Sequence, residues 1–136
     1  MHSETGIMNI LVLEDNSHRI TFFQNALKKH KVTVCRHART AIRALKDGPF
    51  DLIFLDHDLR REPVDPDDEN CGSEVARFIT DHDIECPCII LHTENRIGRE
   101  AMESILPHSQ SIPYSKLKHV RIQSILKNVS NMEGSA

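Results

Sequence analysis

A run of four apolar residues, Leu52 to Leu55, passes without a break into the charged group Asp56-His57-Asp58. Apolar runs of this length, with β-formers at the centre, are typical of a strand that is buried on both faces. Because charged side chains cannot continue through a core, we expect Asp56 to lie at the C-terminal end of this strand. Open parallel sheets keep their ligand crevice at that edge. The sequence therefore predicts a functional site near Asp56.

Two other apolar runs repeat this arrangement. Residues 9–13 are followed at once by Glu14 and Asp15, and residues 88–91 are followed by His92-Thr93-Glu94-Asn95. Residues 32–35 and 111–114 have the composition of two further strands, and Lys116 follows the second of them. Five strands are therefore expected, and polar side chains follow the ends of four of them.

Helices are predicted between these strands from apolar positions at helical spacing and from residues that can cap a helix. The expected caps are Asn16 or Ser17, Thr40, Ser73, and Thr93 or Asn95. The helix after Asn95 is expected to place Ile97, Ala101 and Ile105 on its buried face, and the last helix Ile122, Ile125, Leu126 and Val129.

Strands and helices that alternate in this way predict an α/β fold: a three-layer, doubly wound, five-stranded parallel sheet with right-handed crossovers. The 136 residues are enough for one domain. Its core is expected to span about 9–129, with polar ends at 1–8 and 130–136. Residues 60–72 hold five acidic residues and two prolines, so they are expected to form a mobile, acidic surface loop beside the site, whose role stays open.

Composition excludes several classes of function. The formal net charge is −3 and 27% of the residues are charged, which is neither the basic footprint of a DNA-binding protein nor an acidic tail. No apolar run approaches the length of a membrane span, and residues 1–7 are too polar for a signal peptide. We therefore expect a cytoplasmic protein that contacts neither membrane nor DNA directly.

Parallel strands present their C-terminal ends on one edge, so the carboxylates that follow them are expected to converge. Converged carboxylates repel one another unless a cation lies between them, and oxygen ligands suit Mg²⁺, Mn²⁺ or Ca²⁺. We predict a Mg²⁺ or Mn²⁺ site built from Asp15 and Asp56, with Glu14 or Asp58 assisting. For Asp58, a turn-forming role is an equal alternative.

The other polar side chains near this edge have more than one interpretation. His57 and His92 are either general acid–base groups, transition-metal ligands or hydrogen-bonded residues at the rim. Lys116 either pairs with a carboxylate or a phosphate, or is a solvated lysine at a helix start. The Thr93 hydroxyl can hydrogen-bond a phosphoryl oxygen.

Residues 9–129 resemble the receiver domain of bacterial response regulators. Residues 10–16 are similar to the first strand and acidic pair of a receiver, and Asp56 matches the aspartate that accepts a phosphoryl group. His92 or Thr93 falls where receivers place a hydroxyl residue, and Lys116 falls at the receiver lysine. The resemblance implies the flavodoxin-like strand order 2-1-3-4-5.

The sequence departs from the usual receiver pattern at three places. His57-Asp58-Leu59 replaces apolar residues and a proline, Leu117 replaces the proline after the lysine, and His92 stands at the hydroxyl position. Residues 55–59, together with residues 92–95 and Gly98, look more like a divergent family, the cyclic-phosphate processing receiver-like domain.

Three functions remain open. In the first, which the residues favour narrowly, Asp56 is the phosphoacceptor of a stand-alone receiver in phosphorelay signalling, served by a phosphodonor kinase or another protein partner. A metal, Lys116 and Thr93 would then hold the phosphoryl group. In the second, the same metal pocket hydrolyses cyclic phosphate ends, with His57 and His92 transferring protons. In the third, the domain only binds protein.

Overall fold

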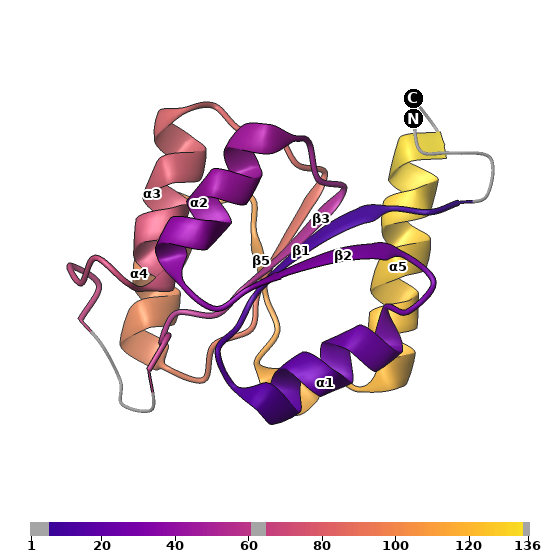
Figure 1. Ribbon diagram of the computed structural model, residues 1–136, viewed down its shortest axis with the longest axis horizontal. Coiled ribbons are helices and arrows are strands. Elements are labelled where there is room, and N and C mark those ends of the chain that lie inside the picture. Colours follow the sequence, from indigo (N-terminus) through magenta and orange to yellow (C-terminus); the bar gives the residue numbers. More distant parts are fainter. Residues whose placement is uncertain (1–5, 61–64, 135–136) are drawn as a thin grey trace.

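The computed structural model describes residues 6–60 and 65–134 and contains one parallel sheet in the order β2-β1-β3-β4-β5 (Figure 1). This confirms the predicted fold class and strand order. The strands are β1 (Asn9–Leu13), β2 (Lys31–Cys35), β3 (Leu52–Leu55), β4 (Cys88–Leu91) and β5 (Gln110–Ser111).

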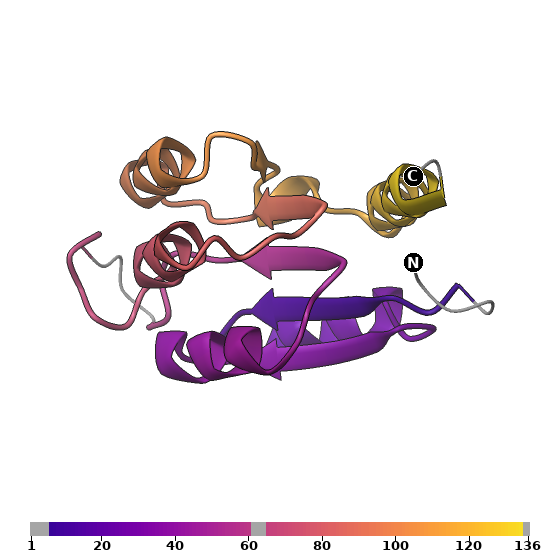
Figure 2. The same ribbon diagram turned by 90° about the horizontal axis from the view of Figure 1, so that it is seen from above.

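Helices cover both faces of this sheet (Figures 1 and 2). They are α1 (Ser17–Ala26), α2 (Ala38–Asp47), α3 (Gly72–Asp81), α4 (Arg96–Ile105) and α5 (His119–Gly134), with a short 3₁₀ helix at Tyr114–Lys116. Successive strand residues point to opposite faces. Val12 and Phe54 accordingly pack with α1 and α5, whereas Leu11 and Ile53 pack with α2, α3 and α4.

Strand register places the site. Leu13 lies opposite Leu55, and Leu55 lies opposite Leu91. The residues that follow these leucines therefore lie at the same level of the sheet. They are Glu14, Asp56 and His92, which are far apart in the sequence. The apolar runs thus fix where the polar side chains that follow them lie.

Two of the four predicted helix caps are confirmed. Asn16 accepts a hydrogen bond from the Arg19 N–H, and Asn95 accepts one from the Gly98 N–H. Thr40 and Ser73 are not caps, which corrects the prediction. α2 begins earlier, at Ala38, whose N–H is bound by the Asn70 side chain. α3 begins at Gly72, and Ser73 is buried and contacts His57.

The buried face of α4 also differs from the prediction. Gly98 and Met102 are buried, whereas Ile97 is 68% exposed. A Cβ built on Gly98 would lie 2.3 Å from His57 Cγ, so the helix approaches the His57 ring too closely for any other residue there. The glycine, which carries no apolar side chain, therefore decides which face of the helix packs inward.

The domain extends slightly beyond the expected core. Met8 is 2% exposed and packs in the core, and α5 continues to Gly134. Within the acidic loop, residues 61–64 lie outside the described residues. Arg60 pairs with Asp68 at 2.9 Å on the two sides of that gap. In the described part of the chain, the helices are all too short or too polar to cross a membrane.

Candidate functional site

Three buried side chains meet where β1, β3 and β4 end. Glu14, Asp56 and His92 directly follow these strands, and each offers one oxygen or nitrogen within 4.8 Å of the other two. Each is at most 5% exposed. The sequence predicted that the polar groups after these three strands would converge, with Asp15, Asp56 and His92 in one crevice. The structure brings the strand ends together, and Asp15 and Asp56 line the pocket whereas His92 does not.

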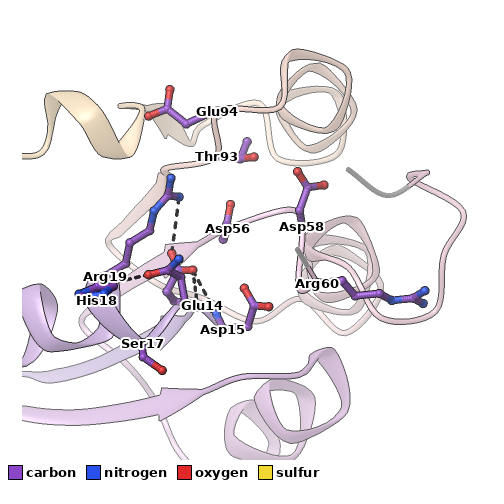
Figure 3. Close-up of a pocket in the computed structure, with 11 residues that line it drawn as sticks. Glu14, Asp15, Ser17, His18, Arg19, Asp56, Asp58, Arg60, Thr93 and Glu94 are labelled. Carbon is purple, nitrogen blue, oxygen red and sulfur yellow. Dashed lines mark hydrogen bonds and ion pairs between the residues drawn. The ribbon is translucent and has the colours of Figure 1, made fainter. Parts of the chain in front are cut away.

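A pocket of about 470 Å³ opens beside this group (Figure 3). Its lining combines five carboxylates with two arginines and a histidine; the residues are Glu14, Asp15, Asn16, Ser17, His18, Arg19, Asp56, Asp58, Arg60, Thr93 and Glu94. The carboxylates come from the loops after β1, β3 and β4, so the fold holds them close together and they repel one another. An anionic ligand therefore requires added positive charge in this pocket.

Hydrogen-bond donors surround the Glu14 carboxylate. Its Oε2 accepts from the backbone N–H groups of Asp15 and Asn16 at 3.1 and 3.0 Å, and its Oε1 lies 2.9 Å from His92 Nε2. Burial alone would raise the pKa of Glu14. The hydrogen bond and charge of His92, with the Asn16 N–H, outweigh burial and leave the pKa below its usual 4.5. Glu14 is thus a charged anchor at the end of β1.

The His92 ring is fully buried behind Glu14, with its centroid 5.1 Å from that of Phe23. Within the described part of the chain, its Nδ1 has no hydrogen-bond partner. A carboxylate only accepts hydrogen bonds, so His92 Nε2 carries a proton at its contact with Glu14. His92 then donates to Glu14 and does not line the pocket.

Asp56 lines the pocket at the end of the central strand, and its Oδ1 accepts the His57 backbone N–H at 2.9 Å. Burial, reinforced by the negative charge of Glu14, raises its pKa from 3.8 to about 6 despite the opposing effect of His92. Burial and Glu14 also raise the pKa of the neighbouring Asp15. Without a cation, the charged forms of Asp56 and Asp15 are therefore disfavoured in this pocket.

The predicted site residues do not all reach the pocket. Thr93 lines it, with its Oγ1 accepting the Asn95 N–H at 3.0 Å. His57 is fully buried outside the lining. Lys116 is exposed at the end of the 3₁₀ helix and is not a lining residue.

Arg19 is a cation that lines the pocket, as Lys116 does not. Its Nη1 lies 4.0 Å from Glu14 Oε1, and its guanidinium stacks 4.4 Å from the centroid of the Tyr114 ring. Sequence reasoning missed Arg19, and also His18 and Arg60. For Arg19 and His18 a signal was available, because a helix that starts just after β1 places its first turn beside the end of that strand.

The side chains present fit a divalent cation. Asp15, Asp56 and Asp58 line one pocket and offer carboxylate oxygens, which are the ligands of hard cations. Among the described residues, the ligand atoms of Glu14, Asp56 and His92 are the ones that lie within 4.8 Å of one another. Oε2 of Glu14 already has two donors, whereas its Oε1 has one. The four predicted metal ligands, Glu14, Asp15, Asp56 and Asp58, thus all line one pocket. They differ in how many of their oxygens already accept hydrogen bonds.

Solved structures with this architecture are receiver domains. The receiver domain of a putative LuxO repressor from Vibrio parahaemolyticus is 18% identical, with a TM-score of 0.70 over 93% of this chain and 92% of that chain. The receiver of a sensor histidine kinase from Pseudomonas aeruginosa PAO1, solved with magnesium in its active-site cleft, is 22% identical, with a TM-score of 0.70 over 92% and 98%. The phosphorylated cyanobacterial phytochrome response regulator RcpA is 20% identical, with a TM-score of 0.63 over 93% and 91%. The fold is therefore that of a receiver domain.

Within this class, the chain belongs to the cyclic-phosphate processing receiver domain family, whose model matches residues 9–108. The match covers all three loops that carry Glu14, Asp56 and His92, but ends before Lys116. Among curated proteins, none matches the chain.

Proposed function

We propose that this domain opens cyclic phosphate esters in a pocket centred on Asp56, with the help of a divalent cation. The observation that carries the proposal is the make-up of the pocket lining. Asp56, Asp15 and Asp58 face one cavity together with Arg19, whereas Lys116, which the signalling interpretation would use to hold the phosphoryl group, lies outside the lining. The family to which the chain belongs supports the same substrate class.

In this proposal the carboxylates of Asp15, Asp56 and Asp58 hold the cation. The cation, when bound, supplies positive charge for the phosphoryl oxygens and lowers the pKa of water. The Arg19 guanidinium and the Thr93 hydroxyl donate hydrogen bonds to the phosphoryl oxygens and so orient the phosphorus. Water adds to phosphorus, one ring P–O bond breaks, and the released oxygen gains a proton.

The two histidines have supporting roles in this proposal. Neither ring lines the pocket, and both are fully buried. His92 holds Glu14 through the 2.9 Å contact, so its removal would leave a buried carboxylate without its principal side-chain donor. Direct proton transfer by His57 or His92, as the sequence suggested, would need either ring to move into the pocket.

A second candidate is phosphorelay signalling with Asp56 as a stable phosphoacceptor and a kinase or another protein as phosphodonor. The observation that favours it is that the Thr93 hydroxyl and Asp56 share the pocket in a receiver fold. One of the similar structures is described as a phosphorylated response regulator. Both candidates use the same carboxylate, so labelling and turnover must be measured side by side.

The test incubates the protein with Mg²⁺ or Mn²⁺ and a 2′,3′-cyclic nucleotide, and separately with acetyl phosphate. We expect turnover of the cyclic ester without a stable phosphoprotein in the intact mass. Asp56→Asn should lower turnover by at least about 100-fold, because it removes the central carboxylate.

Arg19→Met and Lys116→Met form a matched pair for the same assay, because each removes one cation near the site. Arg19→Met should lower turnover at least about tenfold, since charge-assisted hydrogen bonds are among the stronger ones, while Lys116→Met should stay within about twofold of the parent. A stable label that depends on Asp56 and Lys116, without turnover, would instead establish the phosphoacceptor. No reaction in either assay would contradict both candidates.

A further inference from the structure

We infer that His57 is a positioning residue that holds Asp58, a residue of the pocket lining, against the first turn of α4. The hydrogen bonds from His57 to Asp58 and from Asn95 to Asp58 are called the lock below. The inference rests on the proposed function only for what the positioned Asp58 does; the contacts themselves stand without it. His57 directly follows Asp56, yet its side chain turns away from the pocket into the layer formed by α3 and α4.

Both nitrogens of the buried His57 ring have partners. Nδ1 lies 3.1 Å from Asp58 Oδ1, and Nε2 lies 3.0 Å from Ser73 Oγ. A carboxylate only accepts hydrogen bonds, so Nδ1 carries a proton and donates to Asp58, and Nε2 is hydrogen-bonded to the Ser73 hydroxyl. The ring is 0% exposed, so it has no open side from which to exchange a proton with a ligand.

The lock continues from Asp58 into α4. Asp58 Oδ1 also accepts from Asn95 Nδ2 at 3.0 Å, and Asn95 Oδ1 caps the helix by accepting the Gly98 N–H at 3.2 Å. The Asn95 backbone N–H donates to Thr93 Oγ1. One imidazole therefore fixes a carboxylate on one pocket wall and, through Asn95, the threonine on another.

Packing holds the ring in this place. Gly98 lies against the His57 ring so closely that a Cβ there would meet three ring atoms within 2.8 Å. Gly72, at the start of α3, approaches the Asp56 carbonyl and His57 Cα in the same way. Two glycines at helix starts thus leave room for a histidine between them, and the ring bridges β3, α3 and α4.

The test compares two variants of the full-length protein by amide hydrogen exchange. His57→Leu fills much of the space but removes the donor to Asp58, whereas His57→Asn keeps a donor near the Nδ1 position. The probe is the Gly98 N–H, which Asn95 caps. The internal control is the Arg19 N–H, which Asn16 caps in the same way at 3.1 Å in α1, on the opposite face of the sheet from α3 and α4.

We expect His57→Leu to speed exchange at Gly98 by about tenfold with no change at Arg19, and His57→Asn to stay close to the parent. Unchanged exchange at Gly98 in His57→Leu, equal acceleration at both amides, or a His57→Asn variant as impaired as His57→Leu would overturn the inference. If His57→Leu does not fold, Asp58→Ala breaks the same lock at a partly exposed position and must give the same local result. None of these readouts needs metal or substrate, so failure of the lock is distinguishable from failure of the proposed function.

Discussion

Asp56 stands in an environment that disfavours its charged form. Its pKa of about 6 in the folded state exceeds the usual 3.8, chiefly because the carboxyl is buried. Below pH 3.8 the group is protonated in both folded and unfolded chains and costs nothing. As the pH rises from 3.8 to 6, the unfolded chain ionises first, so the free energy of unfolding falls. Above pH 6 the full penalty is present.

Replacing Asp56 by the neutral isostere asparagine should therefore stabilise the metal-free protein at neutral pH. A shift of about 2 pKa units corresponds to a gain of at most about 3 kcal/mol at pH 7.5, and the gain should vanish near pH 3.5. Urea unfolding of both proteins with chelator present measures this difference. A gain of equal size at both pH values would show that charge is not its cause.

Glu14 responds to pH in the opposite direction. Its pKa is lowered in the folded state, so it stabilises the fold above pH 4.5 and this contribution is lost as the pH falls. Two carboxylates that lie side by side thus differ because one has strong donors and the other has few. The donors of Glu14 are the His92 ring and the backbone of its own loop.

At the scale of elements, the approach of α4 to the site depends on a glycine. Gly98→Ala should lower the free energy of unfolding by about 1–3 kcal/mol or more, because its Cβ would overlap the buried His57 ring. Gly48→Ala is the matched control, since a Cβ at Gly48 meets nothing within 4 Å. Chemical unfolding of both variants provides the comparison. Equal stability of the two alanine variants would mean that α4 can withdraw from His57 at no cost.

Particular elements show what could be predicted from the sequence. β1, β3 and β4 match their predicted bounds, because uninterrupted apolar runs have few alternatives to a buried strand. The convergence of Glu14, Asp56 and His92 follows from those runs, because parallel register puts the next residue of each strand at one level. The edge strand β5 has a weak pattern, and its predicted range of 111–114 was wrong. The strand is only two residues long, Gln110–Ser111.

Other features depend on contacts that no local pattern carries. The capping of α2 by Asn70 joins segments that are distant in sequence, whereas the local sequence offers only Thr40 as a cap. Ser73 is recruited by the His57 ring, and the buried face of α4 is set by Gly98. For Lys116 the sequence leaves a phosphate-binding and a solvated lysine open, and the chain forms a 3₁₀ helix there that leaves its side chain outside the pocket lining.

At the scale of the whole molecule, the sheet gathers charge at one edge. Loops after β1, β3 and β4 bring five carboxylates to one pocket, and Arg19 extends into it from α1 (Figure 3). Arg60 also lines the pocket, but its guanidinium points away and pairs with Asp68. Both candidate functions require that this excess negative charge be offset by a divalent cation before a phosphate can approach Asp56. Cation binding at Asp56 is therefore the central requirement of the account.

Anomalous diffraction from a crystal soaked in Mn²⁺ tests this requirement most directly. We predict one strong manganese peak in the pocket, in contact with the Asp56 carboxylate and with Asp15 or Asp58, and its loss in Asp56→Asn. Glu94, an exposed carboxylate at the rim of the same pocket, serves as the internal comparison. No peak at millimolar Mn²⁺, or a peak at Glu94 but not at Asp56, would contradict the account.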